Sequence, residues 1–170
     1  MTISDTKKKY ADCIKTRNGY FVNVFKPDPA TIDIRDIAFA LARMPRFGGH
    51  TNEFFSVARH SVAVHNMMQT DELRLCALLH DASEAYLIDI PSPIKQHLPE
   101  YKTIENGLMY VIADKFGFQW PLPQIVKDAD EVQLEAEWEE LMILENLFRE
   151  TVDFGKDERM FLEAFNDLKI

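Results

Sequence analysis

The chain is poor in the features that mark secreted and membrane proteins. It has only two cysteines among 170 residues, Cys13 and Cys76, and they show no metal-type spacing. No apolar run approaches the length of a membrane span, and the positively charged N-terminus lacks the apolar stretch of a secretory signal. These absences predict a cytoplasmic protein in a reducing compartment, without a membrane partner.

Positive charge is also scarce. Nineteen lysines and arginines stand against 28 aspartates and glutamates, which gives a net charge of −9. Since a general nucleic-acid binder needs a basic surface, this balance argues against nucleic acid as a partner. It is also unfavourable for a small anionic substrate, unless a metal ion and local cations reverse the field at the site.

What the chain does have is hydrophobic residues at helical spacing. Hydrophobic residues make up 46% and charged residues 28% of the sequence, a globular profile, and the length suits one domain over residues 1–170. An Asn-Gly pair within 16–25 predicts a short hairpin. The expected fold is all-α, a helical bundle with a small N-terminal β-hairpin. Helices are predicted over 34–44, 52–70, 101–117, 125–150 and 157–170, with another ending at His80-Asp81.

The stretch 75–95 concentrates the chemistry. It begins as an apolar helix, until His80 and Asp81 break the apolar pattern together and Glu84 follows them. Buried charge is costly unless it is paired or bound to metal, so an adjacent His-Asp pair at the end of an apolar helix favours a divalent metal site. Two prolines should then stop any helix, Pro91 and Pro93.

Further ligands are available outside this stretch. His60 lies on an apolar helical face, where a lone histidine is more often a core residue than a ligand. The helix predicted from residue 125 begins with Asp128 and Asp130, and the spacing leaves both open as inward-facing carboxylates. Two imidazoles and two carboxylates suit a divalent ion with open positions for water and substrate. His65 lies about 500° around the helix from His60 and should point away from such a site.

Four sequence fragments extend the pattern beyond single residues. They read RFGGH, SVARHSV, LLHDASEAYLIDIPSPIK and VKDAD, and they contain His60, His80-Asp81 and Asp130 in that order. Together they resemble the HD superfamily of metal-dependent phosphohydrolases, in particular the small bacterial and phage branch with its 5′-deoxynucleotidases and deoxynucleoside triphosphohydrolases. The resemblance covers roughly residues 17–145. It implies an HD-type helical fold that holds a divalent ion between helices, with Co, Mn, Zn or Mg as the candidates.

The resemblance also implies a metal-ligand set and two catalytic residues. The implied ligands are His60, His80, Asp81 and Asp130. A lysine three residues before the last aspartate is part of the family pattern, and it selects Asp130 over Asp128. Asp81 and Glu84 are the expected catalytic residues, with Glu84 handling protons at the attacking water. On a continuous helix Glu84 would share the face of His80 and Asp81.

Substrate contacts follow from the same resemblance. Arg46, Lys95 and Lys127 are the expected phosphate-binding cations. Phe47 occupies a position where relatives often carry a tryptophan against the nucleoside. His50, at the end of a Gly-Gly loop, is either a substrate-facing residue or part of the loop structure.

The predicted function is metal-dependent hydrolysis of the phosphate ester of a deoxynucleotide, for example dATP. A 5′-deoxynucleotidase and a triphosphohydrolase would share the same ligands, so the motifs do not separate them. The protein is expected to act as a homo-oligomer, a dimer or a hexamer. The alternative is a non-catalytic, metal-stabilised nucleotide-binding regulatory module, against which the complete ligand set and Glu84 argue.

Two features near the end of the long helix have simpler interpretations. Trp138 and the leucines that follow it predict a core or a subunit interface. The acidic run from Glu135 to Glu140 predicts a face exposed to solvent.

Overall fold

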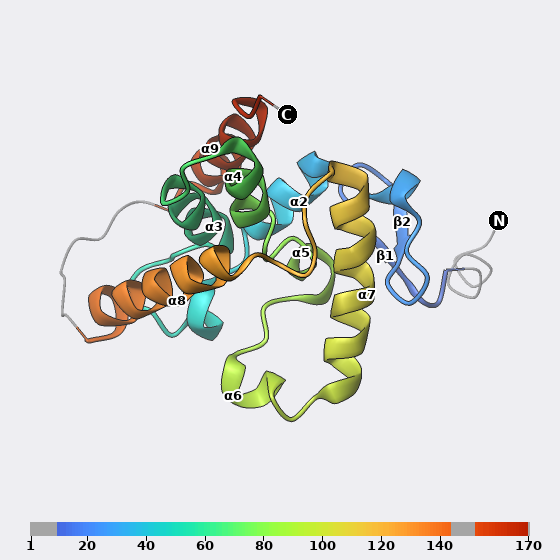
Figure 1. The fold of residues 1–170 in the computed structure, drawn as a ribbon. Helices are drawn as coiled ribbons and strands as arrows, with labels where there is room; N and C mark the ends of the chain where they lie inside the picture. The colour runs from blue at the N-terminus through green and yellow to red at the C-terminus, as the bar shows by residue number, and fades with distance from the viewer. Residues whose placement is uncertain (1–9, 144–151, 170) are drawn as a thin grey trace.

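Helices make up most of the computed structural model, which describes residues 10–143 and 152–169. Two short strands lie near the N-terminus (Figure 1), which confirms the prediction of an all-α protein with a small hairpin. The elements, in chain order, are β1 (Cys13–Lys15), β2 (Phe21–Asn23), η1 (Pro29–Thr31), α2 (Ile34–Leu41), η2 (Arg46–Gly49), α3 (Val57–Asn66), α4 (Asp71–Leu78), α5 (Glu84–Leu87), α6 (Ser92–Lys95), α7 (Pro99–Phe116), α8 (Gln124–Trp138), η3 (Glu139–Ile143) and α9 (Phe154–Asn166).

The hairpin is displaced from its predicted segment. Strands β1 and β2 pair antiparallel, with Ile14 opposite Val22. Gly19 lies in the connecting turn with φ of 88°, a conformation that glycine adopts without strain. Because the Asn-Gly pair occupies the turn itself, the first strand lies before residue 16 rather than inside the predicted segment 16–25.

Capping residues explain where several helices begin and end. α3 begins at Val57, later than predicted, because the Ser56 hydroxyl caps it by accepting from the backbone N–H of Arg59. α7 ends at a left-handed Gly117, as its sequence predicted. α8 ends at Trp138 and continues as a π-helical turn, and the part of the predicted 125–150 helix beyond Ile143 lies outside the described residues.

Two expectations about the central stretch are wrong. α4 ends at Leu78, so His80 and Asp81 lie in a turn and Glu84 begins a separate helix, α5. The three residues therefore do not share one helical face. The prolines also permit a helix, since α6 forms with Pro93 in its first turn, where the missing N–H costs no hydrogen bond.

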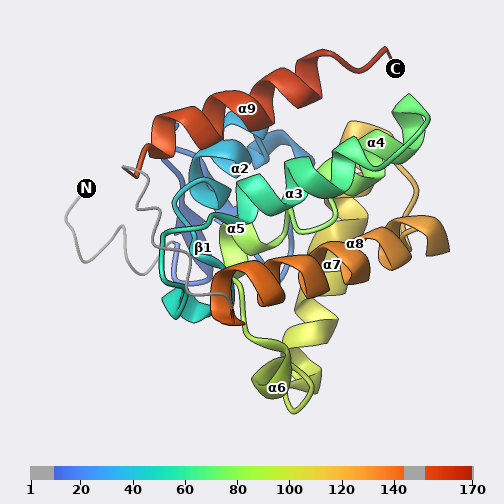
Figure 2. The ribbon, with the colours of Figure 1, turned by 90° about the vertical axis from the view of Figure 1, so that its left-hand side faces the viewer.

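α3 is the element around which the site assembles. It packs against α4, α8 and α9, while α2 packs against α5 and α9. Figure 2 shows α9, the α3–α4 pair and α8 as successive layers, with α6 projecting beyond them. A single buried core runs through these layers, from Val22 in the hairpin to Phe161 in α9. Among the described helices, none has the length and apolar character needed to cross a bilayer.

Candidate metal centre

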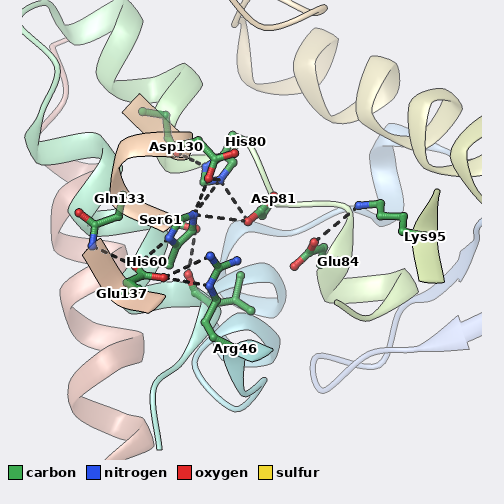
Figure 3. A network of polar contacts seen from close by, with 12 residues as sticks. Arg46, His60, Ser61, His80, Asp81, Glu84, Lys95, Asp130, Gln133 and Glu137 are labelled. Carbon is green, nitrogen blue, oxygen red and sulfur yellow. Dashed lines mark hydrogen bonds and ion pairs between the residues drawn. The ribbon is translucent and has the colours of Figure 1, made fainter. Parts of the chain in front are cut away.

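Three separate elements bring the predicted ligands together. His60 comes from α3, His80 and Asp81 from the turn after α4, and Asp130 from α8. His60 is fully buried and His80 nearly so. Figure 3 shows their side chains converging with those of Asp81 and Asp130 on one point. Because α3 packs against both α4 and α8, residues far apart in sequence meet there.

The donor atoms lie within reach of a single ion. The Nε2 atoms of His60 and His80 are 3.2 Å apart, and Asp130 Oδ1 lies 2.9 Å from the first and 3.6 Å from the second. These three residues form a group whose donor atoms all lie within 4.8 Å of one another, so they could hold a metal ion. Asp81 Oδ2 adds a fourth oxygen at the edge, 3.1 Å from His80 Nε2 and 4.0 Å from His60 Nε2.

Hydrogen bonds on the far side of each ring set the imidazole orientation. His80 Nδ1 lies 2.7 Å from the carbonyl oxygen of Ala77, and His60 Nδ1 lies 2.8 Å from Glu137 Oε1. A carbonyl and a carboxylate can only accept, so each Nδ1 carries the proton and donates it. The two Nε2 atoms then face each other and Asp130. A cation, either a proton on a ring or a metal ion, stabilises such a group of donor atoms, and outer hydrogen bonds of this kind are typical of metal-ligating histidines.

The same crowding shifts the ionisation of the cluster. Burial alone would lower the pKa of His80, but the charge of Asp81 and the hydrogen bond with Asp130 outweigh it and hold the pKa well above its usual value. Burial would raise the pKa of Asp81, yet the charge of His80 brings it down to about 2. Hydrogen bonds with the two histidines likewise outweigh burial at Asp130 and lower its pKa. Both carboxylates are therefore ionised and available to a cation.

The alternative ligand, Asp128, faces away from this cluster. It is exposed on α8 and accepts a hydrogen bond from Gln124 at 2.8 Å. His65 also lies elsewhere, against the backbone carbonyl of Arg74 at 3.1 Å, as its position on α3 predicted. Of the two aspartates that the spacing left open, the structure brings Asp130 to the histidines.

Glu84 lies beside the cluster although it belongs to a separate helix. Its side chain is buried, and Oε2 has no hydrogen-bond partner among the described residues. Lys95 Nζ lies 3.9 Å from the other oxygen. Burial, reinforced by the charges of Asp81 and Asp89, raises the pKa of Glu84 well above its usual value. A buried carboxyl group with a raised pKa is suited to carrying a proton near neutral pH.

The three expected phosphate-binding cations occupy different settings. Arg46 is buried, and its Nη2 lies 3.2 Å from Glu137 Oε2. Lys95 is held mainly by Glu105, at 2.6 Å, with Glu84 farther away. Lys127 is exposed on α8 and makes no hydrogen bond or ion pair with a described residue of the cluster. The structure thus places Arg46 and Lys95 close to the cluster and leaves Lys127 on the surface.

A pocket of about 670 Å³ opens next to the cluster on the Arg46 side. Its walls are largely apolar and aromatic, and His50 lines it together with Phe47. Phe47 has φ of 53°, an uncommon conformation for a bulky residue, of the kind that clusters at ligand sites. The remaining lining residues are Arg46, Asp89, Pro91, Ser92, Pro93, Leu134, Glu135, Trp138 and Met142.

Two residues on α8 differ, wholly or in part, from what the sequence predicted. Glu137 was assigned to a solvent-exposed acidic face, but it is 3% exposed and contacts His60 and Arg46. Trp138 was assigned to a core or a subunit interface. The core alternative is wrong, since Trp138 is half exposed and lines the pocket with its ring 5.7 Å from that of Phe47, whereas the interface stays a prediction. The burial of Glu137 could have been predicted from helical periodicity. Residues 133 and 137 continue the spacing of Val126, Ala129 and Asp130 along one face of the helix.

The fold and the cluster define a helical protein with a candidate divalent metal centre. No family model matches the chain. It is 36% identical over 172 residues to uncharacterized protein YfdR of Escherichia coli K12, covering 91% of this chain and 94% of that protein. It is also 32% identical over 137 residues to uncharacterized protein RCAP_rcc00048 of Rhodobacter capsulatus, covering 73% and 70% of the two chains. The chain therefore belongs to the same family as YfdR.

Proposed function

We propose that this protein is an HD-type metal-dependent phosphohydrolase that hydrolyses the phosphate ester of deoxynucleotides. The observation that carries the proposal is the group of buried histidine Nε2 atoms and Asp130 Oδ1, whose donor atoms all lie within 4.8 Å of one another. His60, His80, Asp130 and Asp81 would hold a divalent ion, which would supply Lewis acidity and a hydroxide nucleophile near neutral pH. The mixed nitrogen and oxygen donors suit Co, Mn or Zn, and Mg remains a candidate.

The residues around the cluster supply the other requirements of ester hydrolysis. Water attacks phosphorus, the bond from phosphorus to the 5′ oxygen breaks, and that oxygen must take up a proton. Glu84, buried beside Asp81 with a raised pKa, handles these protons. Arg46 binds a phosphate oxygen pair from the pocket side, because its guanidinium presents a fork that matches phosphate. Lys95 adds positive charge beside Glu84.

The pocket supports a substrate with an apolar, planar part. A volume of about 670 Å³ lies within the range of small-molecule sites. Phe47, His50 and Trp138 present rings to it, and nucleobases stack on such rings. Arg46 lines the same pocket while contacting Glu137 near the metal cluster. A nucleoside in the pocket would thus place its phosphate toward the metal ligands.

The test is a substrate panel of deoxy- and ribonucleoside mono-, di- and triphosphates. Each is incubated with purified protein and Mn²⁺, Co²⁺, Zn²⁺ or Mg²⁺, and released phosphate is distinguished from triphosphate. We expect metal-dependent release from deoxynucleotides and none from a His80→Ala variant. Tight metal and nucleotide binding without hydrolysis of any substrate would reject the enzyme in favour of a non-catalytic nucleotide-binding module.

A further inference from the structure

Glu137 joins the metal cluster to the cationic wall of the pocket. Its Oε1 lies 2.8 Å from His60 Nδ1, and its Oε2 accepts from Arg46 Nε at 3.2 Å (Figure 3). Gln133, one turn earlier on α8, donates to Oε1 at 3.0 Å. Glu137 is 3% exposed, and a carboxylate buried this deeply is tolerated only when its charge is paired. The hydrogen bonds and ion pairs described for Glu137 go to two residues of the site, His60 and Arg46, and to Gln133 on its own helix.

We infer that Glu137 is a positioning residue that orients His60 toward the metal and Arg46 toward the phosphate. By accepting the Nδ1 proton, it leaves Nε2 of His60 directed at His80 and Asp130. It also holds the Nε side of the Arg46 guanidinium, while no described residue accepts a hydrogen bond from Nη1. The role of Glu137 toward His60, the metal half of this inference, does not depend on hydrolysis. Its role toward Arg46, the phosphate half, rests on the proposed function.

The role requires a carboxylate rather than an amide. Both oxygens of Glu137 act as acceptors, one toward His60 and Gln133 and the other toward Arg46. A glutamine at this position has one oxygen and one NH₂ group. In one amide orientation His60 and Gln133 face an NH₂ group and lose their acceptor. In the other, Arg46 loses its acceptor and His60 donates to an uncharged oxygen, which raises its basicity less than a carboxylate does. A single isosteric substitution should therefore disturb the site without changing its size.

The experiment measures metal and phosphate binding directly. Calorimetry gives the affinity for Co²⁺, the visible spectrum reports the geometry of bound Co²⁺, and a second titration with inorganic phosphate is run at saturating Co²⁺. Glu137→Gln should weaken Co²⁺ binding about 10–100-fold, the usual effect of losing an outer partner of a histidine ligand. It should also alter the Co²⁺ spectrum. The matched control is Glu139→Gln, the same change at an exposed position two residues away, which should leave both unchanged.

A double-mutant cycle tests the link to Arg46. If Glu137 acts on phosphate through Arg46, Glu137→Gln should weaken phosphate binding in the parent but not in the Arg46→Ala background. Additive losses would overturn that half of the inference. Unchanged Co²⁺ affinity and spectrum in Glu137→Gln would overturn the other half. A parent that binds Co²⁺ but hydrolyses nothing would reject the proposed function and leave the role of Glu137 toward His60 standing. A parent that binds none of the metals would reject both.

A milder variant covers the case in which Glu137→Gln does not fold. Gln133→Met keeps the side-chain length and the helix while removing the hydrogen bond to Oε1. It introduces no buried donor, so the fold should survive. We expect a smaller loss of Co²⁺ affinity in the same direction, with circular dichroism unchanged. Parent-like Co²⁺ affinity in Gln133→Met, combined with an unfolded Glu137→Gln, would assign Glu137 to folding rather than to positioning.

Discussion

Asp130→Ala should abolish the stabilisation that a divalent metal gives to the fold. The donors come from three elements, α3, the turn after α4, and α8, so a bound ion links parts of the chain that the unfolded state separates. A ligand that binds only the folded state at 100 times its Kd stabilises it by about 2.7 kcal/mol. In a chain of this size, that stabilisation raises Tm by about 5–11 °C.

The variant should lose nearly all of this increment. Asp130 Oδ1 is the carboxylate oxygen nearest to His60 Nε2 among the described pairs, at 2.9 Å. Loss of a residue that hydrogen-bonds to a metal ligand weakens metal binding about 10–100-fold. Loss of a ligand itself should therefore weaken it at least about 100-fold. At the same metal concentration, a 100-fold weaker Kd leaves a metal stabilisation of about 0.4 kcal/mol, which raises Tm by roughly 1–2 °C.

The assay compares Tm with excess Co²⁺ and with EDTA for each variant, so that each protein is its own reference. Asp128→Ala is the matched control, since it removes an exposed carboxylate two residues away on the same helix. We expect the control to keep the full metal increment. If Asp130→Ala kept the increment and Asp128→Ala lost it, the ligand assignment on α8 would be wrong.

Three further predictions concern catalysis and substrate binding. Glu84→Gln should keep its metal but lose turnover on the order of 10²–10⁴-fold, measured by single-turnover rates alongside metal analysis. Normal turnover in this variant would remove Glu84 from the mechanism. Arg46→Ala should weaken transition-state binding by about 1.5–3 kcal/mol with normal metal content, and Arg46→Lys should rescue it poorly; parent-like kcat/KM in both would place the phosphate elsewhere. Trp138→Ala should raise KM about tenfold or more through lost stacking, whereas its control Tyr110→Ala, at an exposed aromatic on α7, should leave KM unchanged. A KM of Trp138→Ala equal to that of the parent would exclude Trp138 from the substrate pocket.

Local patterns in the sequence were sufficient for most of the helices. Hydrophobic spacing predicted α2, α3, α7 and α9, because the period of a helix fixes which side chains share its buried face. Boundaries were less accurate where a cap decided them, as at Ser56. The end of α4 was predicted late, at His80-Asp81, and the separate start of α5 at Glu84 was missed, since nothing in the run from Leu75 to Leu87 marks a helix boundary as proline or glycine would.

The sequence also singled out the donor residues, but it did not choose among all of them. It identified the residues His60, His80 and Asp81 by their chemistry, and left Asp128 and Asp130 equivalent until a family resemblance was applied. In the structure, Asp130 lies on the α8 face that packs toward α3, and Asp128 lies outside it. The helical period from Val126 would have separated the two aspartates.

Only the tertiary structure revealed Glu137 and the pocket. The helical period from Val126 put Glu137 on the inward face of α8, but nothing local shows what would pair its charge, because its partners, His60 and Arg46, lie 77 and 91 positions away in the sequence. The pocket likewise arises where the loop after α2, the turn before α6 and the end of α8 meet. Helix formation depends on neighbours along the chain, whereas the distances between donor atoms depend on how the helices pack, and packing is set by contacts that are remote in sequence.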